Sequence, residues 1–182
     1  MKNLIIHPKD DTTDFLCGIY SKLRDKTLIT GDISEKKLIA QIRTHERVLM
    51  LGHGSPAGLI SKCSIKDPYG YVVDDSTVKY LQNKKSNIFI WCNADQFVRR
   101  HGLKGFYTGM FISEVLEADM FELPCVTEET IAESNYSFSA IFSKYLAEAP
   151  DKLYHHVLAD YGVLAETNTV AAYNLQRLYY NH

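Results

Sequence analysis

The stretch RVLMLGHGSPAGL, residues 47–59, joins an apolar run to a turn in which His53 stands between two glycines. Residues 48–51 are apolar without interruption, so both faces of the strand that they form would be buried. Strands of this kind lie in the middle of parallel sheets that are covered by helices on both sides. The stretch therefore predicts a central strand over 47–51 in an α/β fold.

The segments around this strand alternate between strands and helices. Short apolar runs predict further strands, and apolar residues at helical spacing predict helices. A hairpin is predicted within 58–75, around Asp67–Pro68 and Tyr69–Gly70. This order indicates a three-layer αβα sandwich with a mainly parallel sheet. The expected strands are 3–7, 26–30 and 87–91, and the expected helices are near 12–23, 34–46 and 76–84.

Beyond residue 92 the pattern favours helices. A polar loop is expected over 93–105, a helix around 106–118 and a short strand over 120–126. Thr127 is expected to begin a helical region that breaks at Pro150 and continues to the end of the sequence. We therefore expect one domain over 1–182, with a sheet core over about 3–126 and a helical C-terminal region over about 127–182. In that region Leu175, Leu178 and Tyr179 are expected to form a helical packing face.

The composition disfavours several classes of partner and cofactor. The 182 residues carry a net charge of −2, which gives no electrostatic reason to expect a nucleic acid or an anionic membrane as partner. The apolar runs are far shorter than the roughly 20 residues of a membrane span, and no signal-peptide pattern occurs, so we expect a cytoplasmic protein. The four cysteines form no C-x-x-C pair, and no histidines have ligand spacing. We expect neither a metal nor another cofactor.

Two chemically active side chains follow two strands of the predicted sheet. His53 comes just after strand 47–51, and Cys92 comes just after strand 87–91. Sites in open parallel sheets form at the carboxyl ends of the strands, and adjacent strands lie roughly 5 Å apart. An imidazole beside the thiol could take its proton during attack on a carbonyl carbon and later protonate the leaving amine. The backbone N–H groups of Gly54 and Cys92 could bind the carbonyl oxygen.

In this order of motifs the sequence resembles the caspase-like cysteine peptidases, the group that includes caspases, gingipains, clostripain and the CHAT domains. In that group one apolar block ends in His-Gly, here VLMLGHG, and a second ends in the nucleophilic Cys, here IFIWC. A hairpin and a helix lie between the blocks, and a polar loop and a helix follow the Cys. The resemblance covers about residues 3–126. It implies a caspase-like sheet, a dyad of His53 and Cys92, and an oxyanion hole from Gly54 and Cys92.

The leading hypothesis is a cysteine endopeptidase that acts on peptide or protein substrates. The sequence departs from the family beside the nucleophile, where Trp91 precedes Cys92 and no glycine follows soon after. Alternation along a strand should place Trp91 on the face opposite to Cys92. The alternative is an inactive caspase-like domain that serves as a protein-interaction module, with a partner on its C-terminal helices. The string GHGS also occurs in sirohydrochlorin-type chelatases, but there it follows the first strand.

Two acidic residues are candidates for substrate binding. Asp95 could bind a basic substrate side chain, although a cap on a turn of the polar loop is the simpler interpretation. Asp75, at the end of the predicted hairpin, could line a substrate pocket, although a solvated hairpin end is the better explanation.

Overall fold

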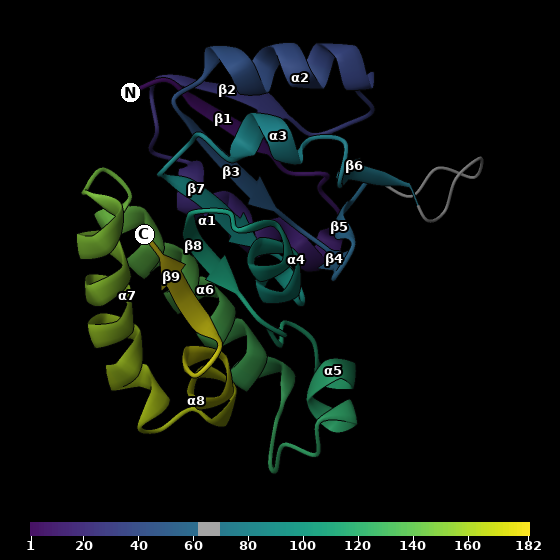
Figure 1. Ribbon diagram of the computed structural model, residues 1–182. Helices are drawn as coiled ribbons and strands as arrows, with labels where there is room; N and C mark the ends of the chain where they lie inside the picture. The colour runs from purple at the N-terminus through teal and green to yellow at the C-terminus, as the bar shows by residue number, and fades with distance from the viewer. Residues whose placement is uncertain (62–69) are drawn as a thin grey trace.

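The short apolar runs of the sequence form one six-stranded sheet. The computed structural model describes residues 1–61 and 70–182, and its strands follow the order β2-β1-β3-β7-β8-β9 (Figure 1). Neighbouring strands are parallel except at one edge, where β8 and β9 are antiparallel. The predicted α/β class and the mainly parallel sheet are confirmed. The strands are β1 (Asn3–Ile6), β2 (Lys26–Ile29), β3 (Arg47–Leu51), β7 (Asn87–Ile90), β8 (Gly105–Thr108) and β9 (Leu178–Asn181).

Helices cover both faces of this sheet. The central strand β3 is fully buried and contributes to two apolar clusters, Val48 and Met50 to one and Leu49 and Leu51 to the other. Figure 1 shows α4 in front of the sheet and α6 behind it. The helices on the Met50 side are α2 (Glu35–Thr44), α3 (Val78–Leu81) and α4 (Ala94–His101). Those on the Leu49 side include η1 (Asp11–Leu16), α1 (Cys17–Tyr20), α6 (Glu128–Tyr145) and α7 (Pro150–Ala165).

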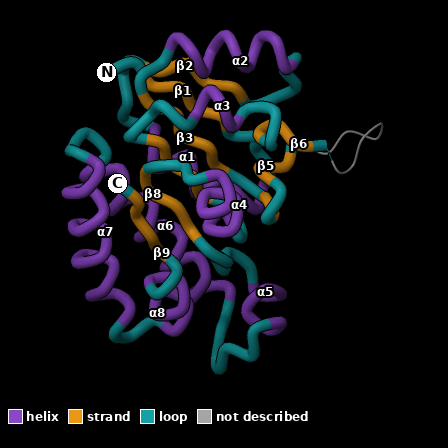
Figure 2. Tube along the Cα trace, in the orientation of Figure 1, coloured by secondary structure: helices purple, strands orange, loops and turns teal. Residues whose placement is uncertain are grey.

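A small antiparallel sheet follows the central strand. It consists of β4 (Gly54–Ser55), β5 (Gly58–Ile60) and β6 (Tyr71–Val73), and it lies to one side of the large sheet in Figure 2. The pairing of β5 with β6 confirms the hairpin predicted within 58–75. Its expected turn residues 67–69, and Cys63, lie outside the described residues.

Between residues 93 and 126 the predicted elements are wrong in three places. The expected polar loop is helix α4, because Ala94, Phe97 and Val98 recur at helical spacing and bury one face against the sheet. The helix expected around 106–118 begins instead with strand β8, and only α5 (Val115–Met120) is helical. The strand expected over 120–126 is absent: Met120, which is 80% exposed, ends α5, and residues 121–126 form turns.

The C-terminal region is helical, but its last residues join the sheet. Thr127 caps α6 by accepting from the Thr130 N–H, and Pro150 opens α7, as predicted. A further helix, α8 (Thr169–Leu175), precedes β9. The expectation of a helix to the end is wrong, because residues 178–181 pair with the open edge of β8. Stacking of Tyr179 on Tyr107, with ring centroids 5.4 Å apart, accompanies this pairing.

The helices give no sign of a membrane span. Among residues 1–61 and 70–182, none of them has both the length and the apolar character that crossing a bilayer requires.

Candidate active site

His53 lies just past the end of β3 and is held by the segment that follows β1. Because β1 and β3 are neighbours, with Ile6 opposite Met50, the residues after β1 reach the same edge of the sheet. His53 Nε2 lies 2.7 Å from Thr12 Oγ1 and 3.2 Å from Asp10 Oδ2. The Thr12 hydroxyl donates to Asp10 Oδ1 over 2.7 Å, so it accepts from an Nε2–H group of His53. In the neutral form of the ring, this tautomer makes Nδ1 the acceptor nitrogen.

Asp10 is the charged partner of this histidine. Partial burial alone would raise the pKa of the Asp10 carboxyl, but hydrogen bonds from Thr12 and Thr13 and the charge of His53 outweigh burial and lower it. Asp10 also caps η1, since its side chain accepts from the backbone N–H groups of Thr12 and Thr13. Asp10 is therefore ionised near neutral pH and fixed in place beside the imidazole.

Cys92 lies just past the end of β7, the other neighbour of β3. Its Sγ lies 3.5 Å from the Phe111 carbonyl oxygen and 3.8 Å from Glu117 Oε1. Burial is the main cause, and the charge of the nearby Glu117 carboxylate the second, that together raise the pKa of the Cys92 thiol to about 12. In this conformation the sulfur is a protonated thiol that donates toward α5 and the loop before it.

His53 and Cys92 line the same small cavity. Its volume is about 20 Å³, which is room for roughly one water molecule. Thr13, Phe15, Phe111 and Ser113 also line it, so its walls come from η1, the ends of β3 and β7, and the loop after β8. The structure thus brings together the two side chains on which the sequence prediction depends.

Gly54 and Trp91 pack against each other beside this cavity. A Cβ on Gly54 would lie 2.1 Å from Trp91 Cδ1, so only glycine fits here. The indole belongs to the apolar cluster with Phe89 and Phe97, on the face opposite to Cys92 as expected, and its Nε1 donates to the Ser55 carbonyl over 3.1 Å. Packing accounts for Gly54, and its role as an oxyanion donor stays a prediction.

The two acidic substrate-binding candidates lie elsewhere. Asp95 is in the first turn of α4, where it pairs with Arg99 over 3.6 Å, so it does not cap a turn in a loop. Asp75 accepts from His101 Nε2 over 3.0 Å and lies 3.5 Å from Arg100. Neither carboxylate is among the described residues that line the cavity of His53 and Cys92.

Three residues of the site were missed in the sequence: Asp10, Thr12 and Glu117. Asp10 and Thr12 carried a usable signal, because they follow the first strand and parallel strands end at one edge of the sheet. Glu117 carried none, since its contact with Cys92 depends on where the loop after β8 folds back. Asn174 of α8 holds that loop in place through the backbone of Ile112. Its side chain accepts a hydrogen bond from Ile112 N over 2.8 Å and donates one to Ile112 O over 2.9 Å.

Within the described parts of the chain, no group of three or more His, Cys, Asp or Glu side chains is placed to hold a metal ion. Comparison of the chain with protein-family models, with curated proteins and with solved structures found no match.

Proposed function

We propose that this chain is a cysteine hydrolase of peptide bonds, with Cys92 as nucleophile and His53 as general base. The observation that carries the proposal is the shared cavity: both side chains line it from the carboxyl ends of neighbouring parallel strands. An intact Asp10–His53 contact adds support, because a carboxylate that orients the imidazole also stabilises its charged form.

The proposed chemistry follows from these positions. His53 Nδ1 accepts the thiol proton as Cys92 Sγ attacks the substrate carbonyl carbon, and the resulting imidazolium gives that proton to the leaving amine. A thioester remains on Cys92. Water, deprotonated by the same imidazole, then attacks the thioester, releases the carboxylic acid and returns the thiol.

The caspase-like architecture is part of this proposal. Between the two apolar blocks the chain forms the small sheet β4–β6 and helix α3, which is the hairpin-and-helix order of that group. We propose further that the conformation seen is a closed resting state. Substrate entry then requires α5 and the loop before it to move, because Phe111 and Glu117 occupy the approach to Cys92.

A second candidate is an inactive domain that acts as a protein-interaction module. The observation that favours it is the same closure: a buried thiol with a pKa of about 12 is a poor nucleophile at neutral pH. In this case the cavity of His53 and Cys92 would be the remnant of a former active site. A protein partner would bind elsewhere, for example on the C-terminal helices.

The two candidates are separated by turnover and by labelling. The chain would be incubated with a peptide library and, in parallel, with peptidyl acyloxymethyl ketones, which alkylate catalytic thiols. Peptidase function predicts cleavage and labelling that disappear in Cys92→Ala and His53→Ala. Cys125→Ala, which removes an exposed cysteine, should change neither. If the folded wild-type chain shows neither cleavage nor labelling, the interaction module is favoured.

A further inference from the structure

A buried histidine, His7, has no part in the chemistry proposed above. It directly follows β1, its surface is fully buried, and its backbone N–H donates to the Ile29 carbonyl of β2 over 2.9 Å. A Cβ on Gly52 would lie 3.8 Å from His7 Cδ2, so the ring lies beside the residue that precedes His53. An imidazole in such a place costs free energy unless both of its nitrogens are hydrogen-bonded.

Both ring nitrogens of His7 have partners. Nδ1 lies 2.9 Å from the Tyr20 hydroxyl of α1, and Nε2 lies 3.3 Å from Thr13 Oγ1 of η1. Burial lowers the pKa of His7 to about 4, so the ring is neutral at pH 7. A neutral imidazole has one donor and one acceptor nitrogen, so it gives each of these two partners a definite role.

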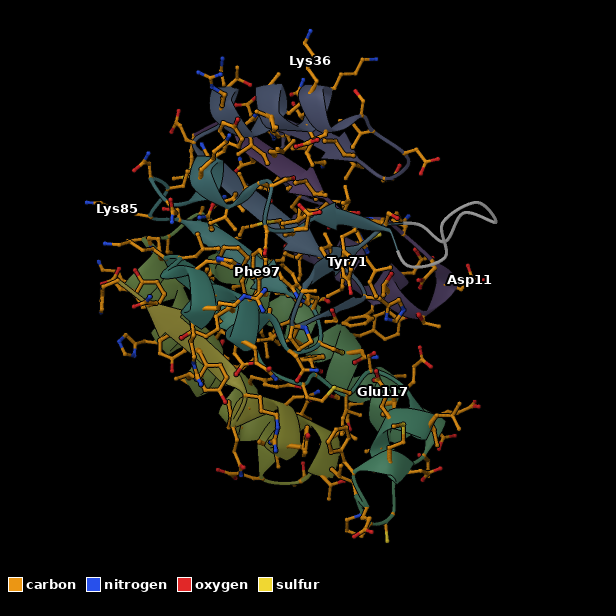
Figure 3. The ribbon with its side chains drawn as sticks, turned by 45° about the vertical axis from the view of Figure 1, so that its right-hand side comes forward. Asp11, Lys36, Tyr71, Lys85, Phe97 and Glu117 are labelled. Carbon is orange, nitrogen blue, oxygen red and sulfur yellow. The ribbon has the colours of Figure 1, made fainter. Side chains whose placement is uncertain are left out.

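Thr13 connects this histidine to the candidate active site. Its side chain is buried, and its hydroxyl lies 3.3 Å from Asp10 Oδ1 and accepts from Asp10 N over 3.3 Å. The other carboxylate oxygen of Asp10, Oδ2, lies 3.2 Å from His53 Nε2. Figure 3 shows Asp11, the first residue of η1, on the same side of the molecule as Glu117, which contacts the proposed nucleophile. Thr13 and Asp10 therefore link the buried imidazole to the proposed general base.

The charge of Asp10 sets the direction of this chain of hydrogen bonds. An ionised carboxylate can only accept, so the Thr13 hydroxyl donates to it. Thr13 Oγ1 then accepts from the Nε2–H group of His7, and His7 Nδ1 accepts from the Tyr20 hydroxyl. The Tyr20 oxygen in turn can accept from the Cys17 thiol, which lies 3.3 Å away. Every donor in the chain is thus directed toward the carboxylate, whose charge strengthens these hydrogen bonds.

We propose that His7 is a positioning residue for the general base. It fixes the Thr13 hydroxyl, and this hydroxyl helps to hold the Asp10 carboxylate against His53. His7 is not among the described residues that line the cavity of the proposed dyad, so it acts through Asp10. A shift of about 1 Å in the groups around a reaction can slow it roughly 100-fold. The effect on turnover rests on the proposed peptidase function, whereas the effect on Asp10 does not.

Two substitutions of His7 separate its hydrogen bond from its packing. His7→Gln keeps an N–H group that can reach Thr13 Oγ1, whereas His7→Leu fills the site with an apolar side chain that has no donor. Both replacements are neutral, so the two variants differ in the donor and not in charge. Ser134→Ala is the control for the loss of a buried hydrogen bond elsewhere, because it removes the 2.7 Å contact with the Tyr161 hydroxyl.

The first measurement is amide hydrogen exchange by NMR, which needs no catalysis. The N–H groups of Thr12 and Thr13 donate to Asp10 Oδ1 over 3.0 and 3.1 Å, so their exchange reports how firmly the carboxylate is held. We expect exchange at these two amides to be about tenfold faster in His7→Leu than in the wild type, because the chain of hydrogen bonds is broken. His7→Gln should exchange like the wild type. So should Ser134→Ala, because lower global stability does not affect amides that exchange by local opening.

The second measurement is the turnover of a peptide that the wild type cleaves. We expect kcat to fall about tenfold in His7→Leu while KM stays unchanged, because the general base acts in the chemical step. His7→Gln should recover most of kcat, since it restores the donor to Thr13. Ser134→Ala should keep the wild-type kcat at a temperature where all variants are folded.

These measurements distinguish failure of the positioning role from failure of the peptidase proposal. If His7→Leu matches the wild type in kcat, or in exchange at Thr12 and Thr13, the positioning role is overturned and the peptidase proposal stands. If His7→Leu and His7→Gln lose kcat equally, packing matters and the donor does not, which also overturns it. Faster exchange in His7→Leu alone, with no cleavage of any peptide by the wild type, contradicts the peptidase proposal and supports the link from His7 to Asp10.

Discussion

Cys92 should react unusually slowly with small alkylating agents, although it is the proposed nucleophile. With a pKa of about 12, about 10⁻⁵ of the thiol is ionised at pH 7. A thiol at the ordinary value of 9.0 has about 10⁻² in the thiolate form. Because the thiolate is the reacting species, alkylation of Cys92 should be roughly a thousandfold slower than that of an ordinary thiol. Burial lowers the rate further by restricting access.

The protein contains its own reference for this measurement. Cys125 is exposed, so the same iodoacetamide pulse labels both residues under identical conditions. Mass spectrometry of the digested protein gives the two labelling rates as a function of pH. We expect the rate at Cys92 to keep rising with pH beyond 9, because its thiol is still almost wholly protonated there.

A substitution in α5 tests the cause of this slow reaction. Glu117→Gln keeps the shape of the side chain and removes its charge from beside the sulfur, so the pKa of Cys92 should fall and labelling should speed up roughly tenfold. Asp119→Asn, on the same helix, is the control and should leave the rate unchanged. Labelling of Cys92 as fast as Cys125 at pH 7 would refute the closed state. An unchanged rate in Glu117→Gln would refute the role assigned to that carboxylate.

Three further predictions concern stability and closure. Burial lowers the pKa of His7 to about 4, so between pH 6.5 and 4 the unfolded chain binds a proton at this residue that the folded chain does not. The free energy of unfolding, measured by denaturant titration, should therefore fall by about 2 kcal/mol from pH 7 to 5, and by less in His7→Gln. Gly54→Ala overpacks the core and should cost about 1–3 kcal/mol in urea unfolding, whereas Gly31→Ala, whose Cβ meets nothing within 4 Å, should cost far less. Asn174→Ala leaves the buried N–H and C=O groups of Ile112 unpaired, so it should destabilise the chain by about 1–3 kcal/mol. It should also speed the labelling of Cys92, because these two hydrogen bonds hold the loop that covers the thiol.

Local patterns in the sequence were sufficient for the first half of the fold. Strands β1, β3 and β7 are apolar on both faces, which is a property of the residues themselves and predicts a buried parallel sheet. Residues that directly follow such strands reach one edge, so the positions of His53 and Cys92 could be predicted without knowing any contact.

The elements that the sequence analysis missed are those whose conformation depends on a distant partner. Residues 178–181 have a spacing that also fits a helix, and they form a strand because β8 leaves an edge open. Residues 94–101 have a polar outer face that suggested a loop, and the helix forms because Phe97 and Val98 bury against the sheet. In both cases long-range packing overrides a weak local preference.

The sequence by itself determined the α/β class and the edge of the sheet at which His53 and Cys92 lie, because both follow from strand periodicity and strand order. Only the tertiary structure decided which side chains surround these two residues. Asp10 reaches His53 because β1 lies beside β3, and Glu117 reaches Cys92 because α8 holds the loop after β8 in place. Whether a thiol is ionised depends on its burial and on neighbouring charges, and both are properties of the folded chain.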